Sequence, residues 1–379
     1  MRMIAAVMHA QGLPMPYAKS QPFRIEEVEL EAPGPGEVLV EIRAAGLCHS
    51  DMSVIAGARK RPLPVVGGHE GAGIVREVGS GVSGLAVGDH VTLAGVAGCG
   101  ECRYCQANRP GLCQAVTGAK AQGLLGTGTR RLRFPNGEPI NHYSGISVYA
   151  QYAVVTPQSL IKIDPDVSLD VAALFGCAVI TGAGAVFNSA KVPAGASVAV
   201  IGLGGVGLTA VMAAREAGAA RIVGVDLLDS KFGLARALGA TDCVLASDPE
   251  VVQQVLALTN GGVDFCFEVS GHPAALEMAR AMTAKGGEVV GVGVNRPETQ
   301  FAVNHLAWVC NEQVLRGSYM GGGVPQDDIP RYVDLYLKGR LPVDQLRSEH
   351  ITFDQLNEGF DALHSGKAIR QILLPHGTV

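Results

Sequence analysis

The stretch Ser197-Val-Ala-Val-Ile-Gly-Leu-Gly-Gly-Val-Gly207 decides the fold of half of this chain. Its apolar beginning predicts a buried parallel strand over 197–201, and the glycines that follow predict a tight turn into a helix over 208–217. Gly202 permits the turn, Gly204 lets a diphosphate approach the backbone, and Gly207 allows the helix to pack closely on the strand. Gly205 and Val206 complete a loop that places the phosphates at a helix N-terminus. On its own, the pattern is equally typical of an ordinary glycine turn.

The residues after this stretch favour dinucleotide binding. A second strand, predicted over 221–225, ends at Asp226, nineteen residues after Gly207. A carboxylate at that place accepts hydrogen bonds from both hydroxyls of the adenosine ribose. It also repels a 2′-phosphate, and Leu227 and Leu228 add no base beside it. The sequence therefore favours NAD over NADP.

The next hundred residues alternate between helix and strand. Helices are predicted over 231–238, 249–258 and 273–283, and strands over 243–246, 263–269 and 287–294. This alternation predicts an α/β fold with a doubly wound parallel sheet. At 379 residues, the whole chain is long enough for two domains.

Composition excludes several classes of protein. Hydrophobic residues make up 47% of the chain and charged residues 17%, so the chain is not of the disordered class. The net charge is -5 and no long basic run occurs, which excludes nucleic acid as a partner. Two uncharged stretches, 171–190 and 197–214, contain Gly, Ser and Thr and lack basic flanks, so we expect buried segments and no membrane span. The N-terminal apolar run ends at His9, which predicts a cytoplasmic protein without a signal peptide.

Four cysteines lie close together in a C-x2-C-x2-C-x7-C pattern. Four thiolates at this spacing close a tetrahedral zinc shell and leave no position for substrate. An iron–sulfur cluster and a group of free thiols are the alternatives. We expect a structural zinc lobe over 95–116, held by Cys99, Cys102, Cys105 and Cys113.

A second set of metal-ligand residue types is dispersed along the chain. Cys48 opens Cys48-His-Ser-Asp51, His69 lies in Gly68-His-Glu-Gly71, and Cys177 follows Gly176. Two thiolates and one imidazole leave the fourth position of zinc open for water or substrate, as in catalytic sites. Taken one at a time, each is more often a buried hydrophobic cysteine or a satisfied core histidine.

Taken together, these motifs resemble the zinc-containing medium-chain alcohol dehydrogenases. The resemblance runs nearly from end to end and includes Asn357-Glu-Gly-Phe-Asp361 and Ser365-Gly-Lys-Ala-Ile-Arg370. The length of segment 112–155 resembles the longer, class III-like branch of the family. The resemblance implies a GroES-like β-barrel catalytic domain, formed by 1–178 plus 321–379, with a Rossmann NAD-binding domain inserted over 179–320. The active site is then expected in the cleft between the domains.

The resemblance also implies roles for individual residues. A catalytic zinc held by Cys48, His69 and Cys177 would polarise an alcohol oxygen while NAD accepts the hydride. Ser50 would take the proton from the alcohol, and Asp51 would orient His69. Glu70 would be either an aid to ligand exchange or a carboxylate that stabilises the fold. Further coenzyme contacts are expected at Thr181 (nicotinamide), Lys231 (ribose), Arg370 (pyrophosphate), Val292 and Val294, with solvated surface charge as the alternative for Lys231 and Arg370.

Three positions depart from the pattern of many relatives. Ser53 stands where a histidine passes the proton to solvent, so the outer relay is in doubt. His49 stands where an arginine contacts the pyrophosphate, and a mostly neutral imidazole holds phosphate less firmly, so we expect faster release of coenzyme. Gly95 stands where an aromatic side chain narrows the substrate pocket. The sequence therefore predicts a preference for bulky or aryl primary alcohols and their aldehydes.

Two other functions stay open. The first is oxidation of a thiol adduct of formaldehyde, which needs a cationic anchor; Arg130, Arg131 and Arg133 are candidates, unless they are solvated loop charges. The second is a nucleotide-binding protein without enzymatic activity. A homodimer, with a tetramer as the alternative, is expected through the apolar stretches 287–294 and 301–310, which include Trp308. The cysteines left over, Cys243, Cys266 and Cys310, are expected to be buried and unpaired.

Overall fold

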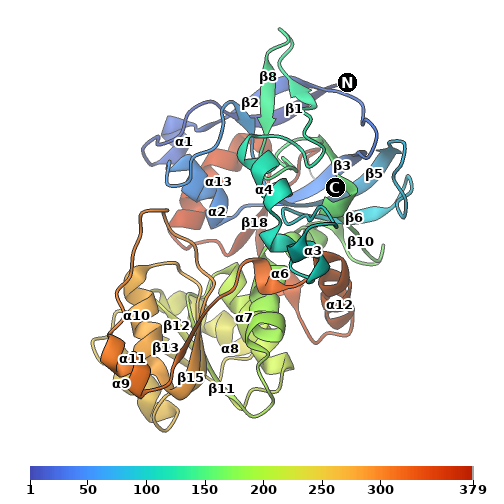
Figure 1. Cartoon of the computed structure of the whole chain (residues 1–379). Helices are drawn as coiled ribbons and strands as arrows, with labels where there is room; N and C mark the ends of the chain where they lie inside the picture. Colours follow the sequence, from blue (N-terminus) through green and yellow to red (C-terminus); the bar gives the residue numbers. More distant parts are fainter. Residues whose placement is uncertain (378–379) are drawn as a thin grey trace. The chain divides into compact units, whose positions relative to one another are not determined.

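The computed structural model describes residues 1–377 and divides into two compact units (Figure 1). The first unit comprises Met1–Cys177, Val324–Asp334 and the chain from Val343 onward; the second comprises Ala178–Gly323 and Leu335–Pro342. The boundaries expected at 178/179 and 320/321 fall at 177/178 and 323/324. Residues 335–342, which include the end of a helix, belong to the second unit, and no pattern in the sequence predicted this.

The first unit is built on a closed barrel and a larger sheet. The barrel has the strand order β1 (Arg2–Met8), β2 (Phe23–Leu30), β7 (Leu132–Arg133), β8 (Pro139–His142) and β4 (Val65–Val66). The sheet has the order β10 (Leu160–Lys162), β6 (His90–Ala94), β5 (Glu70–Val78), β3 (Val38–Gly46), β18 (Arg370–Leu373) and β17 (Arg347–Ile351), with β9 (Tyr152–Val155) also on β3. Its helices are α1 (Tyr17–Ser20), α2 (His49–Ile55), α3 (Arg103–Gln106), α4 (Gln114–Ala121), α5 (Leu169–Ala172), α12 (Pro325–Leu337, which crosses the boundary) and α13 (Leu356–His364).

The β3–β5 pair sets the position of the site. β3 is mainly apolar and is buried along almost its whole length, as is typical of a central strand. It pairs antiparallel with β5, and Ala45 lies opposite Gly71. Because Cys48 follows the end of β3 and His69 precedes the start of β5, both side chains lie at the same end of the pair.

A third segment reaches the same place through a glycine. The 3₁₀ segment η3 (Ala173–Gly176) packs on β5 and β6, and leads directly into Cys177. A side chain on Gly176 would lie 2.0 Å from the carbonyl oxygen of Leu93 in β6. Only glycine lets the backbone approach this closely, and the close approach brings Cys177 to the β3–β5 end.

The second unit is a parallel sheet of six strands. Its order is β13 (Asp242–Leu245), β12 (Arg221–Asp226), β11 (Ser197–Ile201), β14 (Val263–Glu268), β15 (Thr283–Gly291) and β16 (Val314–Gly317). In chain order this is 3-2-1-4-5-6, the doubly wound arrangement of dinucleotide-binding domains. The helices are α6 (Ala178–Gly184), α7 (Gly205–Glu216), α8 (Phe232–Leu238), α9 (Val251–Leu258), α10 (Pro273–Met282) and α11 (His305–Cys310). The predicted α/β class, with its Rossmann and GroES-like parts, is confirmed.

Several local predictions need correction. The helix expected from residue 208 begins at Gly205, because Gly204 is its N-cap and Gly205 and Gly207 take helical conformations. The strand expected over 287–294 starts earlier, at Thr283, and ends at Gly291. Cys266 is buried and Cys243 half-buried, but Cys310 is exposed, because it ends a helix whose residues are not buried in the unit.

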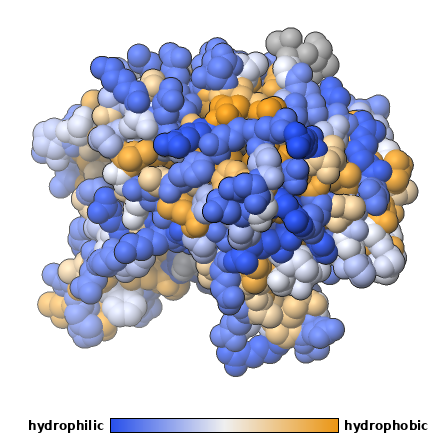
Figure 2. Space-filling view, turned by 90° about the horizontal axis from the view of Figure 1, so that it is seen from above, coloured by the Kyte–Doolittle hydropathy of each residue, from blue (hydrophilic) through white to orange (hydrophobic). Residues whose placement is uncertain are grey.

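No single helix among residues 1–377 is long and apolar enough to cross a membrane. One bent pair of helical segments, Leu169–Gly176 and Ala178–Ala190, has the length and composition of a membrane span, by these two criteria alone. The face drawn in Figure 2 is mostly hydrophilic, with hydrophobic residues gathered in separate patches.

Candidate functional site

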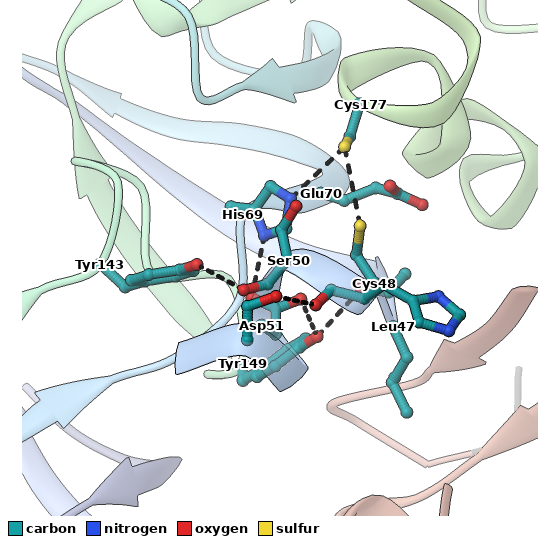
Figure 3. A network of polar contacts seen from close by, with 12 residues as sticks. Leu47, Cys48, Ser50, Asp51, His69, Glu70, Tyr143, Tyr149 and Cys177 are labelled. Atoms are coloured by element: carbon teal, nitrogen blue, oxygen red, sulfur yellow. Dashed lines mark hydrogen bonds and ion pairs between the residues drawn. The ribbon is translucent and has the colours of Figure 1, made fainter. Parts of the chain in front are cut away.

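Three buried side chains of the first unit converge on one point. The possible ligand atoms of Cys48, His69 and Cys177 all lie within 4.8 Å of one another. The two sulfurs are 3.9 Å apart, and Cys177 Sγ lies 3.4 Å from His69 Nε2 (Figure 3). The three residues come from places as far apart in the chain as 48 and 177, so only the folded unit brings them together.

These separations fit a tetrahedral zinc ion. Bonds of about 2.3 Å to sulfur and about 2.0–2.1 Å to nitrogen, at tetrahedral angles, require sulfurs about 3.8 Å apart and a sulfur about 3.6 Å from the nitrogen. The observed distances are 3.9 Å and 3.4 Å. Two thiols and one imidazole also favour zinc, because hard cations such as Mg²⁺ and Ca²⁺ prefer oxygen ligands.

The two thiols influence each other strongly. The contact with Cys177 lowers the pKa of Cys48 well below its usual range, and the same contact raises the pKa of Cys177 well above it. Both shifts follow from two sulfurs that share one dry site, where a second negative charge is costly. A divalent cation between them removes that cost, so the thiol pair is itself a feature that suits a metal.

Asp51 and Tyr149 form a chain of hydrogen bonds behind His69. Asp51 Oδ1 accepts from His69 Nδ1 at 2.8 Å, which leaves Nε2 directed at the sulfurs. Tyr149 lies with its hydroxyl 2.9 Å from Asp51 Oδ2 and 3.1 Å from the carbonyl oxygen of Gly46 (Figure 3). Burial, and then the charge of Asp51, raises the pKa of Tyr149 well above its usual value, so the hydroxyl stays a donor.

Glu70 is enclosed beside the cluster. Neither carboxylate oxygen has a hydrogen-bond partner among the described residues, and Arg370 Nε lies 3.8 Å from Oε1. Burial raises the pKa of Glu70 to about 7, although the charge of Arg370 opposes the rise. A side chain on Gly46 would lie 2.2 Å from Oε1, so this carboxylate depends on glycine at 46. The unpartnered oxygens again suit a nearby cation.

Arg370 is therefore not the solvated surface charge that was the alternative for it. It is 2% exposed and donates from Nη1 to the carbonyl oxygen of Leu47 at 3.0 Å. Its contact with pyrophosphate stays a prediction.

Helix α2 carries the residues expected to move the proton. Ser50 is half-buried in its first turn, beside Asp51 and near His69 (Figure 3). Ser53 Oγ donates to the carbonyl oxygen of His49 at 3.0 Å within the same helix. His49, expected at the pyrophosphate, is exposed at the start of α2. Because Ser53 bonds its own helix backbone, it does not replace the missing outer histidine in this structure.

Gly95 lies beside the metal-ligand residues. A Cβ atom at this position would lie 3.6 Å from Ser144 Cβ and 3.8–3.9 Å from atoms of His69, which are ordinary contacts. The φ angle of Gly95 is not positive, so its backbone does not lie in the left-handed region. A Cβ atom at 95 therefore fits without displacing a neighbour.

The four-cysteine lobe also assembles. The sulfurs of Cys99, Cys102, Cys105 and Cys113 all lie within 4.8 Å of one another, with Cys102 and Cys105 3.6 Å apart. Backbone N–H groups donate to Cys113 Sγ and Cys99 Sγ, each at 3.4 Å. Such bonds, chiefly those from Glu101 and Cys102, lower the pKa of Cys99 to about 7, while burial raises the pKa of Cys105 to about 12. A side chain on Gly98 would meet Cys105 Sγ at 2.7 Å.

The glycine loop of the second unit has the geometry that its sequence predicts. Gly202 has φ of +99°, and no atom lies within 4 Å of a Cβ built on Gly204. A Cβ on Gly207 would lie 1.8 Å from the carbonyl oxygen of Gly202. The loop follows β11, beside the point where the strand order reverses between β11 and β14, and open α/β sheets bind ligands at such points. Gly205 and Val206 form the first turn of α7.

Asp226 is held at the end of β12. Its carboxylate accepts from the backbone of Leu203 at 2.6 Å and of Leu228 at 3.0 Å, and Lys231 Nζ lies 3.1 Å from both oxygens. The inference from Leu227 and Leu228 that no base lies beside Asp226 is therefore wrong. The turn after β12 brings Lys231 into contact with the carboxylate. Lys231 is mostly buried, so it too is not a solvated surface charge.

The other expected coenzyme contacts are spread over the second unit. Thr181 is buried in α6 and its hydroxyl lies 3.6 Å from Met320 Sδ. Val292 is buried just after β15, whereas Val294 is 55% exposed. Their contacts with coenzyme stay predictions.

The arginines proposed as a cationic anchor are bound within the barrel. Arg131 Nε donates to the fully buried Glu37 at 2.7 Å and pairs with Glu31, which also pairs with Arg133. Burial would raise the pKa of Glu37, but hydrogen bonds, from Thr129 and Arg131 first, hold it below its usual value. Arg130 donates to Asn141 and to the carbonyl oxygen of Gln122. Arg131 is therefore held in an ion pair with a buried carboxylate, whereas Arg133 pairs with Glu31 while its side chain stays 42% exposed.

Sequence reasoning missed the aromatic residues around His69. Tyr149 supports Asp51, and the Tyr143 ring meets the His69 ring edge to face at 5.7 Å between centroids (Figure 3). Both lie in an irregular segment without a motif. The stretch Tyr143-Ser-Gly-Ile-Ser-Val-Tyr149 mixes polar and apolar residues, so it gives no signal of contact with the site.

Two family models match most of the chain. Residues 34–165 match the model described as the alcohol dehydrogenase GroES-like domain, and residues 205–338 match the model described as zinc-binding dehydrogenase.

Individual proteins are similar along nearly the whole length. An S-(hydroxymethyl)glutathione dehydrogenase of Escherichia coli is 38% identical over 361 residues, which cover 94% of this chain and 97% of that protein. The crystal structure of an alcohol dehydrogenase zinc-binding domain protein from Burkholderia ambifaria is 37% identical, with a TM-score of 0.93 over 99% of this chain and 100% of that one. Benzyl alcohol dehydrogenase from Acinetobacter calcoaceticus is 31% identical, with a TM-score of 0.91 over 99% of both chains.

The hydrogen bond from Tyr149 to Asp51 generates a prediction. Tyr149→Phe removes only the hydroxyl, so Asp51 loses a donor and holds His69 less firmly. Changes to groups that orient a metal ligand cost about 10- to 100-fold in metal affinity, and we expect a loss of roughly 10-fold here. Chelator competition for zinc measures the change. Tyr17→Phe, at another buried tyrosine, is the control, and equal zinc affinity in the two variants would contradict the prediction.

Proposed function

The chain belongs to the zinc-containing medium-chain alcohol dehydrogenase family, and on that basis we propose that it oxidises primary alcohols, bulky or aryl ones included, to aldehydes. The reaction would be reversible, with NAD as the hydride acceptor. The observation that carries the proposal is the convergence of Cys48, His69 and Cys177 at separations that fit zinc, next to Ser50.

In the proposed reaction, each residue has a physical task. Cys48, His69 and Cys177 would hold a zinc ion that acts as a Lewis acid on the alcohol oxygen. Asp51 fixes the tautomer of His69 by accepting from Nδ1, so that Nε2 keeps its lone pair for the metal. Ser50 would accept the alcohol proton, since a hydroxyl can donate and accept at once. Glu70 would add negative charge behind the ligands, as an exchange aid or as a structural carboxylate.

We assign a second, structural zinc to the four-cysteine lobe. Four sulfurs fill a tetrahedral shell, so this metal would not touch substrate. Both thiol clusters need reduced cysteines, which supports the cytoplasm as the proposed location.

NAD is the proposed coenzyme. Asp226 stands at the end of β12, where a carboxylate binds ribose hydroxyls and repels a 2′-phosphate. Lys231 neutralises part of its charge, which weakens the repulsion but leaves the two carboxylate oxygens as acceptors. His49, Thr181, Val292, Val294 and Arg370 are retained as proposed coenzyme contacts.

Gly95 supports a bulky or aryl substrate. It lies next to His69 without a side chain, so the volume beside the metal site is larger than with an aromatic residue at 95. The similarity to a benzyl alcohol dehydrogenase agrees with this proposal.

One observation favours a second candidate function. The relatives at 38% identity are named S-(hydroxymethyl)glutathione dehydrogenases, so a thiol adduct of formaldehyde is the alternative substrate. The barrel arginines Arg131 and Arg133 do not support it, because Glu31 and Glu37 already pair with them. NAD reduction by formaldehyde, with and without glutathione, distinguishes the two candidates.

The main test combines catalysis with metal content. We expect the purified protein to hold two zinc ions per chain and to reduce NAD, faster than NADP, with benzyl alcohol. Cys48→Ser should remove one zinc and lower kcat/KM by more than the roughly 100-fold seen for residues outside the ligand shell. Cys310→Ser, at an exposed cysteine outside both clusters, is the control. Zinc without any alcohol-dependent NADH would refute the proposed function and favour a nucleotide-binding protein.

A second test concerns the pocket. Gly95→Phe should fill the volume beside His69 and lower kcat/KM for benzyl alcohol by roughly 10-fold relative to ethanol, the usual order for steric discrimination in an apolar pocket. Gly95→Ala adds one methyl group with ordinary contacts and should keep the wild-type preference. If ethanol were already the better substrate of the wild type, the pocket proposal would be wrong.

A homodimer is the proposed assembly. Several large apolar side chains are exposed near the edge strand β16 or in it, namely Val294, Phe301, Leu306, Trp308, Val309 and Val314. Exposed apolar groups beside the free edge of a sheet favour association.

Light scattering should give the mass of two chains, and Leu306→Asp should raise the dimer dissociation constant at least about 10-fold, because a charge would be buried. Val87→Asp, at a 65% exposed valine of the first unit, is the control. A wild-type monomer would contradict the assembly, and a tetramer would require another surface.

A further inference from the structure

Three consecutive cations lie in the loop between α2 and β4 and have no part in the alcohol chemistry described above. They are Arg59, Lys60 and Arg61, in the sequence Gly57-Ala-Arg-Lys-Arg-Pro62. Lys60 is exposed, whereas Arg59 and Arg61 are half-buried. Three positive charges in one short loop attract an anion.

The backbone of this loop is fixed to the helix that carries Ser50 and Asp51. The N–H of Arg59 donates to the carbonyl oxygen of Ser53 at 3.1 Å. The Gln11 side chain donates to the carbonyl oxygens of Val54 and Arg59 at 2.9 Å and 3.2 Å, and its own oxygen accepts from the N–H of Arg61 at 3.2 Å. The backbone that carries the two arginines therefore has a defined place relative to α2.

Arg61 and the metal-ligand histidine both contact one aromatic ring. The Arg61 guanidinium lies 5.9 Å from the centroid of the Tyr143 ring, and that ring lies 5.7 Å from the His69 ring. The Tyr143 hydroxyl lies 3.5 Å from the carbonyl oxygen of Ser50 (Figure 3). Burial raises the pKa of Tyr143 well above its usual value, and the charges of Arg61 and Arg59 oppose this rise, as expected if both guanidinium groups are close to the ring.

These cations have no carboxylate partner within residues 1–377. Arg61 Nη1 donates to the carbonyl oxygen of Lys60 at 3.0 Å, and Arg59, Lys60 and Arg61 form no ion pair with the described residues. Arg131 and Arg133, by contrast, are paired with Glu31 and Glu37. Two half-buried guanidinium groups without a counter-charge retain the capacity for charge-assisted hydrogen bonds to a carboxylate.

We propose that Arg61, assisted by Arg59, binds a carboxylate of the substrate, so that the preferred alcohols and aldehydes of this protein are anionic. This inference rests on the proposed function and names its substrate class. Because Arg61 and His69 both contact the Tyr143 ring, we take as the probe an alcohol with one ring between its hydroxymethyl group and its carboxylate, a hydroxymethylbenzoate. The same subsite replaces the barrel arginines as the cationic anchor for a carboxylate-bearing thiol adduct.

The test compares two substrates that differ only in charge. Wild-type kcat/KM should be higher for 4-(hydroxymethyl)benzoate than for benzyl alcohol, by roughly 10- to 100-fold, the usual order for a hydrogen bond to a charged group. Arg61→Gln should abolish most of this preference through KM and leave kcat/KM for benzyl alcohol nearly unchanged. Arg59→Gln should reduce the preference less, and Arg61→Lys should retain part of it. Arg24→Gln makes the same charge change on an exposed residue of β2 and is the matched control.

Several results would overturn the subsite. One is equal wild-type kcat/KM for the two substrates. Another is an equal loss on both substrates in Arg61→Gln and Arg59→Gln, which would assign the arginines to packing around Tyr143. A higher KM for NAD with an unchanged substrate preference would identify the coenzyme diphosphate as the anion.

If neither alcohol is oxidised, the proposed function is wrong, but the subsite can still be tested. Calorimetric titration of the zinc-loaded protein with the two alcohols then still decides the subsite. Tighter binding of 4-(hydroxymethyl)benzoate that is lost in Arg61→Gln supports it, and equal binding of the two alcohols overturns it.

Discussion

Two thiol sulfurs and an imidazole nitrogen held together in a dry interior are the constraint on which the first unit depends. Cys48 Sγ and Cys177 Sγ are 3.9 Å apart, and both residues are buried. Neighbouring thiolates repel each other strongly when little water surrounds them, so the surrounding structure must supply both rigid support and a place for positive charge. The β3–β5 pair, Gly176 and the Asp51–Tyr149 contact give the support. Arg370 supplies one positive charge, and the close approach of the three ligand atoms suits a divalent metal.

Local patterns explain what could be predicted from sequence. The glycine loop, Asp226 and the four-cysteine lobe each lie within a short span, so their spacing alone restricts the geometry. The alternation of helix and strand in the second unit likewise depends on local periodicity, and it predicted each strand from β11 to β15 to within a few residues. The three dispersed ligand residues required the family resemblance, because no spacing rule joins positions 48, 69 and 177.

Contacts made by tertiary folding account for what the sequence did not disclose. Lys231 reaches Asp226 through the turn after β12, and Arg131 contacts Glu37, which is 94 residues away in the chain. Tyr143, Tyr149 and Arg61 come to the His69 side of the barrel from segments without a motif. The exposed Cys310 shows the opposite error, since a cysteine in an apolar stretch was expected to be buried. In each case the missing information was which segments become neighbours.

The two thiol clusters differ in how much of the chain each one joins. Cys99 and Cys113 are 14 residues apart, whereas Cys48 and Cys177 are 129 apart. Closing the short loop costs less chain entropy, and the lobe carries all four of its ligands within that loop. It can therefore chelate metal while the polypeptide is still emerging from the ribosome. The other cluster exists only after residue 177 has been synthesised and β3, β5 and η3 have packed together. All four cysteines of the lobe are therefore present in the nascent chain before the second cluster is complete.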